Sequence, residues 1–327
     1  MRIAITELRD KVLGTLLAAF PLQEAAEVAD YLVWAEMSGI HTQGIVKLAG
    51  TEPLQGIVPR GEVHVERDTS LSQLINANAH PAPFVSNMAT RVAIAKAKEH
   101  GFALVGVHNF FSSNGALAYY GEVIARSGLI GMVMARSPGA VAPFGTIDPL
   151  FGTNPVCFAF PTLDQPLVFD TATSAMTWYG LVVARANGDR IPQGVAIDHS
   201  GKPTVDPDAA MKGALMPFDG SYRGSGLGMV VEIMAGPLAA SAHCDCNTFA
   251  EEWGSSFLAL DPALLVDPGR FRADVSDLME VVRNARRMGG APVPRLPGER
   301  ARKSWELAQG RGTVDVDQLT MVELGYI

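Results

Sequence analysis

The chain has 327 residues, of which 48% are hydrophobic and 18% charged, and its formal net charge at pH 7 is −8. This length predicts about two domains, or one large intertwined unit with a substantial core. The acidic balance argues against a nucleic-acid partner, because it would repel a phosphate backbone. Glycines and prolines spread along the chain argue against low-complexity disorder.

The cysteines and the N-terminus indicate the compartment. The chain has three cysteines, Cys157, Cys244 and Cys246. This low, odd number argues against a disulfide framework and for a reducing environment. Residues 1–7 lack the apolar core of a signal peptide, and no apolar run is long enough to span a bilayer. We therefore expect a cytoplasmic protein with no membrane partner.

The first forty residues predict two helices. Thr6 is placed to cap the first helix, and Pro21 separates it from the second, which ends at Gly39. The apolar residues of the first helix recur at helical spacing, at Leu8, Val12, Leu16 and Phe20. A loop with a short helix is expected over residues 40–60.

Beyond residue 69, strands and helices alternate, which predicts an α/β protein. Strands are expected at 69–77, 102–107, 129–134, 156–160, 167–169 and 257–260. Helices are expected at 84–100, 116–127, 174–186 (capped by Ser174), 225–240 and 271–288. Polar or Pro/Gly-rich loops are expected at 108–115, 138–149 and 187–208.

A glycine-rich stretch, 224–228, opens one of these helices, where backbone amides could meet a phosphate. Its spacing is not the G-x-G-x-x-G fingerprint, and no clear strand precedes it. The pattern alone therefore favours close helix packing through glycine. Residues 169–174 place a carboxylate and three hydroxyls where a strand ends, a common ligand position in α/β sheets. Helix capping by Asp170 or Ser174 is an equally open alternative.

Metal binding is not expected. Residues 243–246, His-Cys-Asp-Cys, put three possible ligands into four positions, but no second pair of ligands exists elsewhere. His41 and His108 lie in predicted loops, where a histidine is more often functional than elsewhere.

A series of short motifs covers nearly the whole chain in a fixed order. They are PLFGTNP (149–155), FDTATSAM (169–176), IPQG (191–194), TVDP (204–207), LMPF (215–218), RGSG (223–226) and RLPGE (295–299). The series resembles the malate/L-lactate dehydrogenase-like family, which includes ureidoglycolate and sulfolactate dehydrogenases and reductases of cyclic imines.

The resemblance implies NADH or NADPH as cofactor, without choosing between them, and a homodimer. It implies a non-Rossmann, mixed-sheet cofactor domain embraced by helical N- and C-terminal parts. We expect the NAD(P)-binding domain at 120–250 and the helical, substrate-side domain at 1–119 plus 251–327. The implied cofactor contacts are Ser137, Asp170, Thr171, Ala172, Arg223, Gly224, Pro297, Gly298 and Glu299.

The catalytic positions depart from the family pattern. Where relatives carry Ser-His-Gly and then an arginine, this chain has Thr42, Gln43, Gly44 and Lys47, and a second expected histidine aligns with Ser113. Glutamine can donate a hydrogen bond but cannot release a proton near neutral pH. Lysine keeps a positive charge for a substrate carboxylate but lacks the planar fork of arginine.

Two routes could supply the missing proton. His41 would share a face with Gln43 if this stretch were extended, and His108 could approach from its loop. Alternatively, a protonated imine already carries its proton. The catalytic candidates are therefore His41, Thr42, Gln43, Lys47 and Ser113. We expect hydride transfer to a small 2-imino (cyclic ketimine) or 2-oxo carboxylate, the alternative being a dinucleotide-binding member that has lost or changed its activity.

Overall fold

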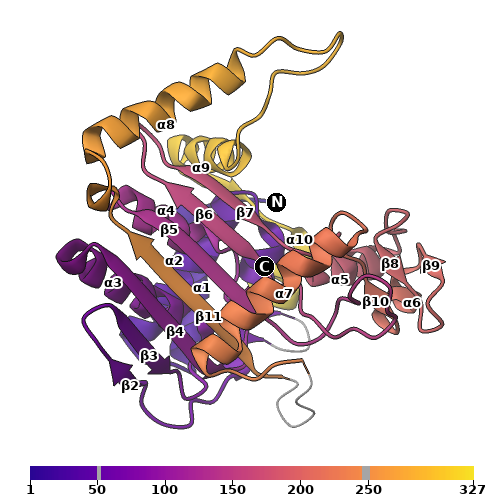
Figure 1. Cartoon of the computed structure of the whole chain (residues 1–327). Helices are drawn as coiled ribbons and strands as arrows, with labels where there is room; N and C mark the ends of the chain where they lie inside the picture. Colours follow the sequence, from indigo (N-terminus) through magenta and orange to yellow (C-terminus); the bar gives the residue numbers. More distant parts are fainter. Residues whose placement is uncertain (50–52, 245–250) are drawn as a thin grey trace.

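The computed structural model describes residues 1–49, 53–244 and 251–327. Its centre is a seven-stranded mixed sheet in the order β2-β3-β4-β11-β5-β6-β7 (Figure 1). Neighbouring strands are antiparallel except β3 and β4, which run parallel. The strands are β2 (His64–Asp68), β3 (Ser72–Asn76), β4 (Phe102–Phe110), β5 (Ile130–Arg136), β6 (Val156–Phe160), β7 (Leu167–Thr171) and β11 (Trp253–Leu260).

Helices cover both faces of this sheet (Figure 1). On one face lie α1 (Ile5–Leu17), α2 (Leu22–Met37), α3 (Ala82–His100) and α4 (Ala118–Arg126), which share the largest apolar core with the strands. On the other face, α7 (Tyr222–Ala235) packs against β5 and β11 through Val231 and Ala235. Burial on both faces explains why the central strands are continuous apolar runs.

A small lobe stands beside the end of α7 (Figure 1). It contains a three-stranded sheet, β10-β8-β9, and has an apolar core of its own that includes Phe151, Leu181 and Leu215. Its elements are α5 (Trp178–Asn187), β8 (Ala196–Ile197), β9 (Pro203–Thr204), α6 (Pro207–Met211) and β10 (Ala214–Leu215).

The C-terminal part returns to the N-terminus. Figure 1 shows α8 and the loop after it projecting beyond the other elements, before the chain comes back to α9. Strand β12 then pairs antiparallel with β1, so both termini lie together. The elements are β1 (Arg2–Ala4), α8 (Pro268–Arg283), α9 (Glu299–Arg311), β12 (Thr313–Asp315) and α10 (Gln318–Glu323). None of the described helices has the length and apolar composition to cross a membrane.

The expected alternation of strands and helices is confirmed, whereas several predicted ends are wrong. Helix α1 begins at Ile5 without a side-chain cap, so Thr6 is not its cap. Helix α5 begins four residues after Ser174, at Trp178, and is capped by the hydroxyl of Thr177. Ser174 instead donates to the carbonyl of Met176, because its hydroxyl serves a turn before the helix.

Candidate functional site

The segment after α2 carries most of the catalytic candidates and forms two 3-10 helices, η1 (His41–Gln43) and η2 (Ile45–Leu48). Glu36, only 3% exposed at the end of α2, fixes its path. One carboxylate oxygen accepts the Ile45 N–H at 2.8 Å, and the other lies 2.6 Å from Nδ1 of His41. A Cβ at Gly44 would lie 2.0 Å from the first oxygen, so this path requires glycine.

The expected extended geometry between His41 and Gln43 is wrong. Residues two apart in a 3-10 helix project from different sides, because a turn takes about three residues. His41 instead lines a cleft of about 170 Å³ with residues of α9 and β12, among them Arg311 and Asp315. The hydrogen bond with Glu36 raises the pKa of His41, although burial opposes it.

Lys47 lies where the main body meets the small lobe. It is only 6% exposed, and its Nζ stands 3.3 Å from the ring centroid of Tyr179 on α5. Nearby in sequence, the buried Oε1 of Gln43 has no hydrogen-bond partner among the described residues. A buried amide oxygen left unpaired costs about 1–3 kcal/mol, so a ligand N–H that reached it would be bound favourably.

The loop that carries Ser113, the remaining catalytic candidate, is anchored by the same helix. The Tyr31 hydroxyl, from α2, accepts the N–H of Ala116 at 2.6 Å, and a Cβ at Gly115 would collide with it. Ser113 accepts the N–H of Gly115 at 3.0 Å, so its hydroxyl closes a local turn. Helix α2 therefore positions both loops, through Glu36 and Tyr31.

His108 does not lie in a loop, contrary to expectation. Strand β4 continues to Phe110, and Nε2 of His108 stands 3.0 Å from the Glu66 carboxylate on β2. Because β4 pairs with β3 at this position, the backbone of His108 lacks the freedom of a loop residue.

Asp170 and Thr171, two of the predicted cofactor contacts, are the last two residues of β7. The Asp170 carboxylate accepts the N–H of Ala118, the first residue of α4, at 2.8 Å. The expected capping of the following helix by Asp170 or Ser174 is wrong, because Thr177 caps that helix. Burial raises the pKa of Asp170 to about 6, against the lowering effect of the amides of Ala118 and Leu117. The Thr171 hydroxyl donates to the carbonyl of Ala172.

Hydrogen bonds join the segments that surround the predicted cofactor residues. Ser137 accepts the N–H of Thr153 at 3.2 Å, and the carbonyl of Thr153 accepts the N–H of Thr173 at 2.9 Å. Asn154, with a positive φ of 38°, donates to the carbonyl of Gly228 in α7. The ends of β5 and β7, the start of β6 and helix α7 thus meet around the predicted cofactor residues.

A buried ion pair beneath this cluster was not predicted from the sequence. Arg136 Nε lies 3.1 Å from the Glu232 carboxylate, and both side chains are almost fully buried. Arg136 also donates to the carbonyls of Ser137 and Glu252, and Asn154 donates to Glu232. Burial raises the pKa of Glu232, although Arg136 opposes this. The sequence did carry a signal for this ion pair, because Arg136 and Glu232 are single charged residues of opposite sign within apolar stretches of β5 and α7.

At the start of α7, the backbone N–H groups of Arg223 and Gly224 already donate hydrogen bonds to side chains of this chain. Ser221 accepts the N–H of Arg223, and Asp219 accepts the N–H of Gly224, both at 3.1 Å. A Cβ at Gly224 would lie 2.4 Å from Asp219 and 3.0 Å from Pro217, which supports the packing explanation of this glycine. The Arg223 side chain is exposed.

The turn at Pro297 comes back to the sheet. Gly298 has a φ of +81°, and its Cβ would stand 2.9 Å from the carbonyl of Val168 in β7. Glu299 accepts from Arg283 at 2.6 Å and from the N–H of Leu296. Burial would raise the pKa of Glu299, but these donors outweigh it and lower the pKa.

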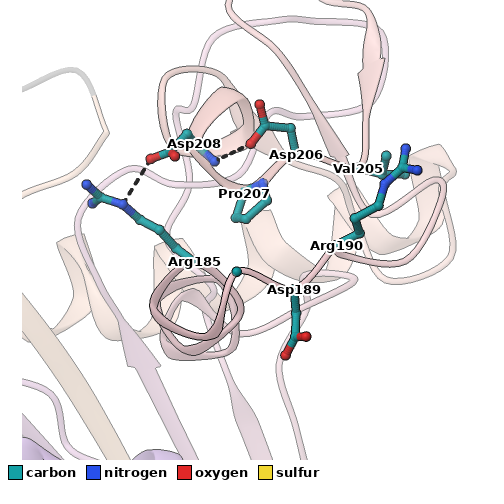
Figure 2. Close-up of a pocket in the computed structure, with 8 residues that line it drawn as sticks. Arg185, Asp189, Arg190, Val205, Asp206, Pro207 and Asp208 are labelled. Carbon is teal, nitrogen blue, oxygen red and sulfur yellow. Dashed lines mark hydrogen bonds and ion pairs between the residues drawn. The ribbon is translucent and has the colours of Figure 1, made fainter.

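Two other features belong neither to the catalytic candidates nor to the predicted cofactor contacts. A cleft of about 250 Å³ in the small lobe is lined by Arg185, Arg190 and Asp206, and Figure 2 shows Arg185 paired with Asp208. No predicted site residue lines it. Part of the His-Cys-Asp-Cys motif, residues 245 and 246, lies outside the described residues. Within the described part of the chain, no group of three metal-ligating side chains is placed to hold a metal.

The profile of the malate/L-lactate dehydrogenase family matches residues 3–325. The chain belongs to this family. It is 36% identical over 300 residues to L-sulfolactate dehydrogenase of Methanothermobacter thermautotrophicus, covering 87% of this chain and 86% of that protein. It is 31% identical over 324 residues to Δ1-pyrroline-2-carboxylate reductase of Ancylobacter novellus, covering 95% and 93%.

The solved structures agree on the fold. Malate dehydrogenase of Entamoeba histolytica superimposes with a TM-score of 0.92 at 24% identity, covering 100% of this chain and 96% of that one. The family match confirms the resemblance found in the motifs. The chain is an NAD(P)-dependent oxidoreductase, and its relatives act on small carboxylates.

Proposed function

We propose that this protein is an NAD(P)H-dependent reductase of a small 2-imino carboxylate, a cyclic ketimine, or of a related 2-oxo carboxylate. The observations that carry the proposal are the buried ammonium of Lys47 and, four residues earlier in the chain, the buried Oε1 of Gln43, which has no hydrogen-bond partner among the described residues. The first binds the substrate carboxylate. The second accepts an N–H.

A protonated imine fits this pair better than a ketone does. Its N–H donates to Gln43, whereas a ketone oxygen has no hydrogen to offer. Hydride addition to the protonated imine gives a neutral amine directly, so the missing histidines matter less. A 2-oxo acid needs a proton on its developing oxyanion, a contribution typically worth about 10²–10⁴ in rate. The pyrroline-2-carboxylate reductase among the relatives supports this choice.

The cofactor site is proposed at the end of β7. The residues that would hold NAD(P) are Ser137, Asp170, Thr171, Ala172, Arg223, Gly224 and the turn Pro297, Gly298 and Glu299. When bound, the nicotinamide supplies a hydride. The exposed guanidinium of Arg223 suits a phosphate, whereas the Gly224 amide is already bonded to Asp219. The side chain, more than the helix amides, would therefore carry the phosphate contact.

We further propose a non-Rossmann cofactor domain at 120–250, with 1–119 and 251–327 forming the substrate side. The support is that α7 follows the small lobe instead of a strand of the main sheet. The antiparallel pairing of β5, β6 and β7 is a second departure from the parallel Rossmann order.

The test is oxidation of NADH and of NADPH, followed by absorbance, with Δ1-pyrroline-2-carboxylate, Δ1-piperideine-2-carboxylate and pyruvate. We expect turnover of at least one cyclic ketimine, with a kcat/KM at least about tenfold above that for pyruvate. Lys47→Met should raise the KM by about 10–100-fold, since a hydrogen bond to a charged group contributes about 1.5–3 kcal/mol. Turnover of pyruvate in preference to both imines would reject the imine assignment.

The second candidate function is that of a family member that binds the cofactor but does not turn over a substrate. Gln43 and Ser113, where the resemblance predicts histidines, favour it. Thermal unfolding separates the two candidates. Cofactor at about 100 times its dissociation constant stabilises the fold by about 2.7 kcal/mol in both cases. Only the reductase then oxidises that cofactor in the presence of a carboxylate substrate.

A further inference from the structure

We propose that Tyr179 positions Lys47 for the substrate carboxylate. Its aromatic ring restrains the lysine ammonium, which lacks the rigid, planar donor arrangement of an arginine. The inference rests on the proposed function and adds to it a residue that no motif identified. Tyr179 lies 132 positions from Lys47 in the chain, and the two meet only through the fold.

The contact is close and sheltered. The Lys47 ammonium lies 3.3 Å from the centroid of the Tyr179 ring, well inside the distance of about 6 Å at which a cation is attracted by a ring face. Lys47 is buried, and Tyr179 is partly buried. Because shielding from water strengthens a cation–π contact, this one belongs at the stronger end of the range.

The chemistry explains why such a partner is needed. An arginine meets a carboxylate through a planar fork whose donors are already arranged, whereas the lysine ammonium is a point charge on a flexible stem. A ring face beneath the ammonium removes much of that freedom before the substrate arrives. The carboxylate then binds a group that is already in place, which lowers the entropy lost on binding.

Each partner is held by its own part of the fold. Lys47 follows the turn that Glu36 fixes through the N–H of Ile45. Tyr179 is the second residue of α5, whose start is capped by Thr177 and whose Leu181 is fully buried in the core of the small lobe. The contact therefore joins the lobe to the main body, and carboxylate affinity depends on the lobe being in place.

The experiment measures binding of pyrrole-2-carboxylate to the protein saturated with its cofactor, by fluorescence titration. This planar carboxylate resembles a cyclic ketimine but is not reduced. Tyr179→Leu should weaken its binding by about tenfold, the range expected for a sheltered cation–π contact. Tyr179→Phe keeps the ring and should remain within about twofold. Trp178→Leu, the neighbouring residue, 38% exposed, is the matched control and should not change binding.

A double-mutant cycle with Lys47→Met decides between positioning and general packing. If Tyr179 acts through Lys47, Tyr179→Leu has little further effect once the ammonium is gone. Equal weakening in both backgrounds would overturn the inference while leaving the proposed function intact. In turnover, Tyr179→Leu should raise the KM for the ketimine and leave kcat within about threefold.

Two further outcomes are informative. If Tyr179→Phe weakens binding as much as Tyr179→Leu, the hydroxyl and not the ring is responsible, and the inference is overturned. If the wild-type protein binds its cofactor but neither binds pyrrole-2-carboxylate nor reduces any carboxylate tested, the proposed function fails, and this inference fails with it.

Discussion

At the scale of single residues, the candidate catalytic site has Gln43 where the resemblance predicts a histidine. The amide of Gln43 offers a buried oxygen but no acidic proton, and neither of the two histidines considered as replacements is placed as expected. His41 pairs with Glu36 and lines a cleft with α9, and His108 is fixed in β4 beside Glu66. These positions support the proposal of a substrate that brings its own proton.

Restoring the acid should therefore change the preferred substrate. We expect Gln43→His to raise kcat with pyruvate by about 10²-fold or more, because a positioned acid contributes about 10²–10⁴. This gain should fall as the pH rises through the pKa of the histidine, near 6.5 for an unperturbed one. Turnover of the cyclic ketimine should not increase, since that substrate is already protonated.

Gln43→Asn is the matched control, because it shortens the amide without adding an acid. Steady-state rates of both variants with pyruvate, measured from pH 5.5 to 8.5, would check the prediction. Equal rates for the two variants would show that the proton is not what limits reduction of the 2-oxo acid.

At the scale of elements, a residue predicted for the cofactor site also links a strand to a helix. Asp170, the penultimate residue of β7, accepts the N–H of Ala118 at the start of α4, so a residue proposed for the cofactor site also holds a helix. Its carboxylate is charged in surroundings that disfavour charge, and burial raises its pKa to about 6. This arrangement has a consequence for stability that depends on pH.

A carboxyl whose pKa is higher in the folded than in the unfolded state destabilises the fold once it ionises. For Asp170 the cost is absent below about pH 4, grows between pH 4 and 6, and stays constant above. Asp170→Asn keeps an acceptor for the N–H of Ala118. It should therefore stabilise the protein at pH 7.5 by about 1–3 kcal/mol, and have little effect near pH 4. Urea unfolding without cofactor at both values measures this, and a gain that is equal at both would contradict the assigned cause.

How far the sequence predicted the elements depended on whether their signal was local. Strand β6 has the predicted bounds, and α3 begins two residues before its predicted start, because apolar periodicity lies within a single segment. Caps were less predictable. Thr6 and Ser174 have the right side chains for capping, but the backbone turned into helix at other residues.

In the candidate site, too, features with a local sequence signal were predicted and features without one were missed. The motifs predicted which segments gather around β7, and the turn at Gly298 does lie against Val168. No local pattern could predict the contact between Lys47 and Tyr179, or the ion pair between Arg136 and Glu232, because each joins residues far apart in sequence. The 3-10 turn at His41 depends on Glu36, a helix residue that no motif includes.

At the scale of the whole molecule, α8 stands out because one of its faces has no partner within the described chain. Leu278, Val281 and Val282 recur at helical spacing and are exposed, Val281 to 67%. The opposite side packs inward through Met279. An apolar stripe on a projecting helix is costly in water and is typical of an interface. We therefore predict that the homodimer implied by the resemblance forms through α8.

Placing a charge on this stripe should separate the subunits. A charge buried without a partner in an interface is strongly unfavourable, so Leu278→Asp with Val281→Asp should convert the dimer to a monomer at micromolar concentration. Size-exclusion chromatography with light scattering measures the mass directly. Leu319→Asp, on α10 and similarly exposed at 73%, is the control and should leave the dimer unchanged. A double variant that remains dimeric and folded would show that the subunits meet elsewhere, because two aspartates on each copy of α8 could not be buried against each other.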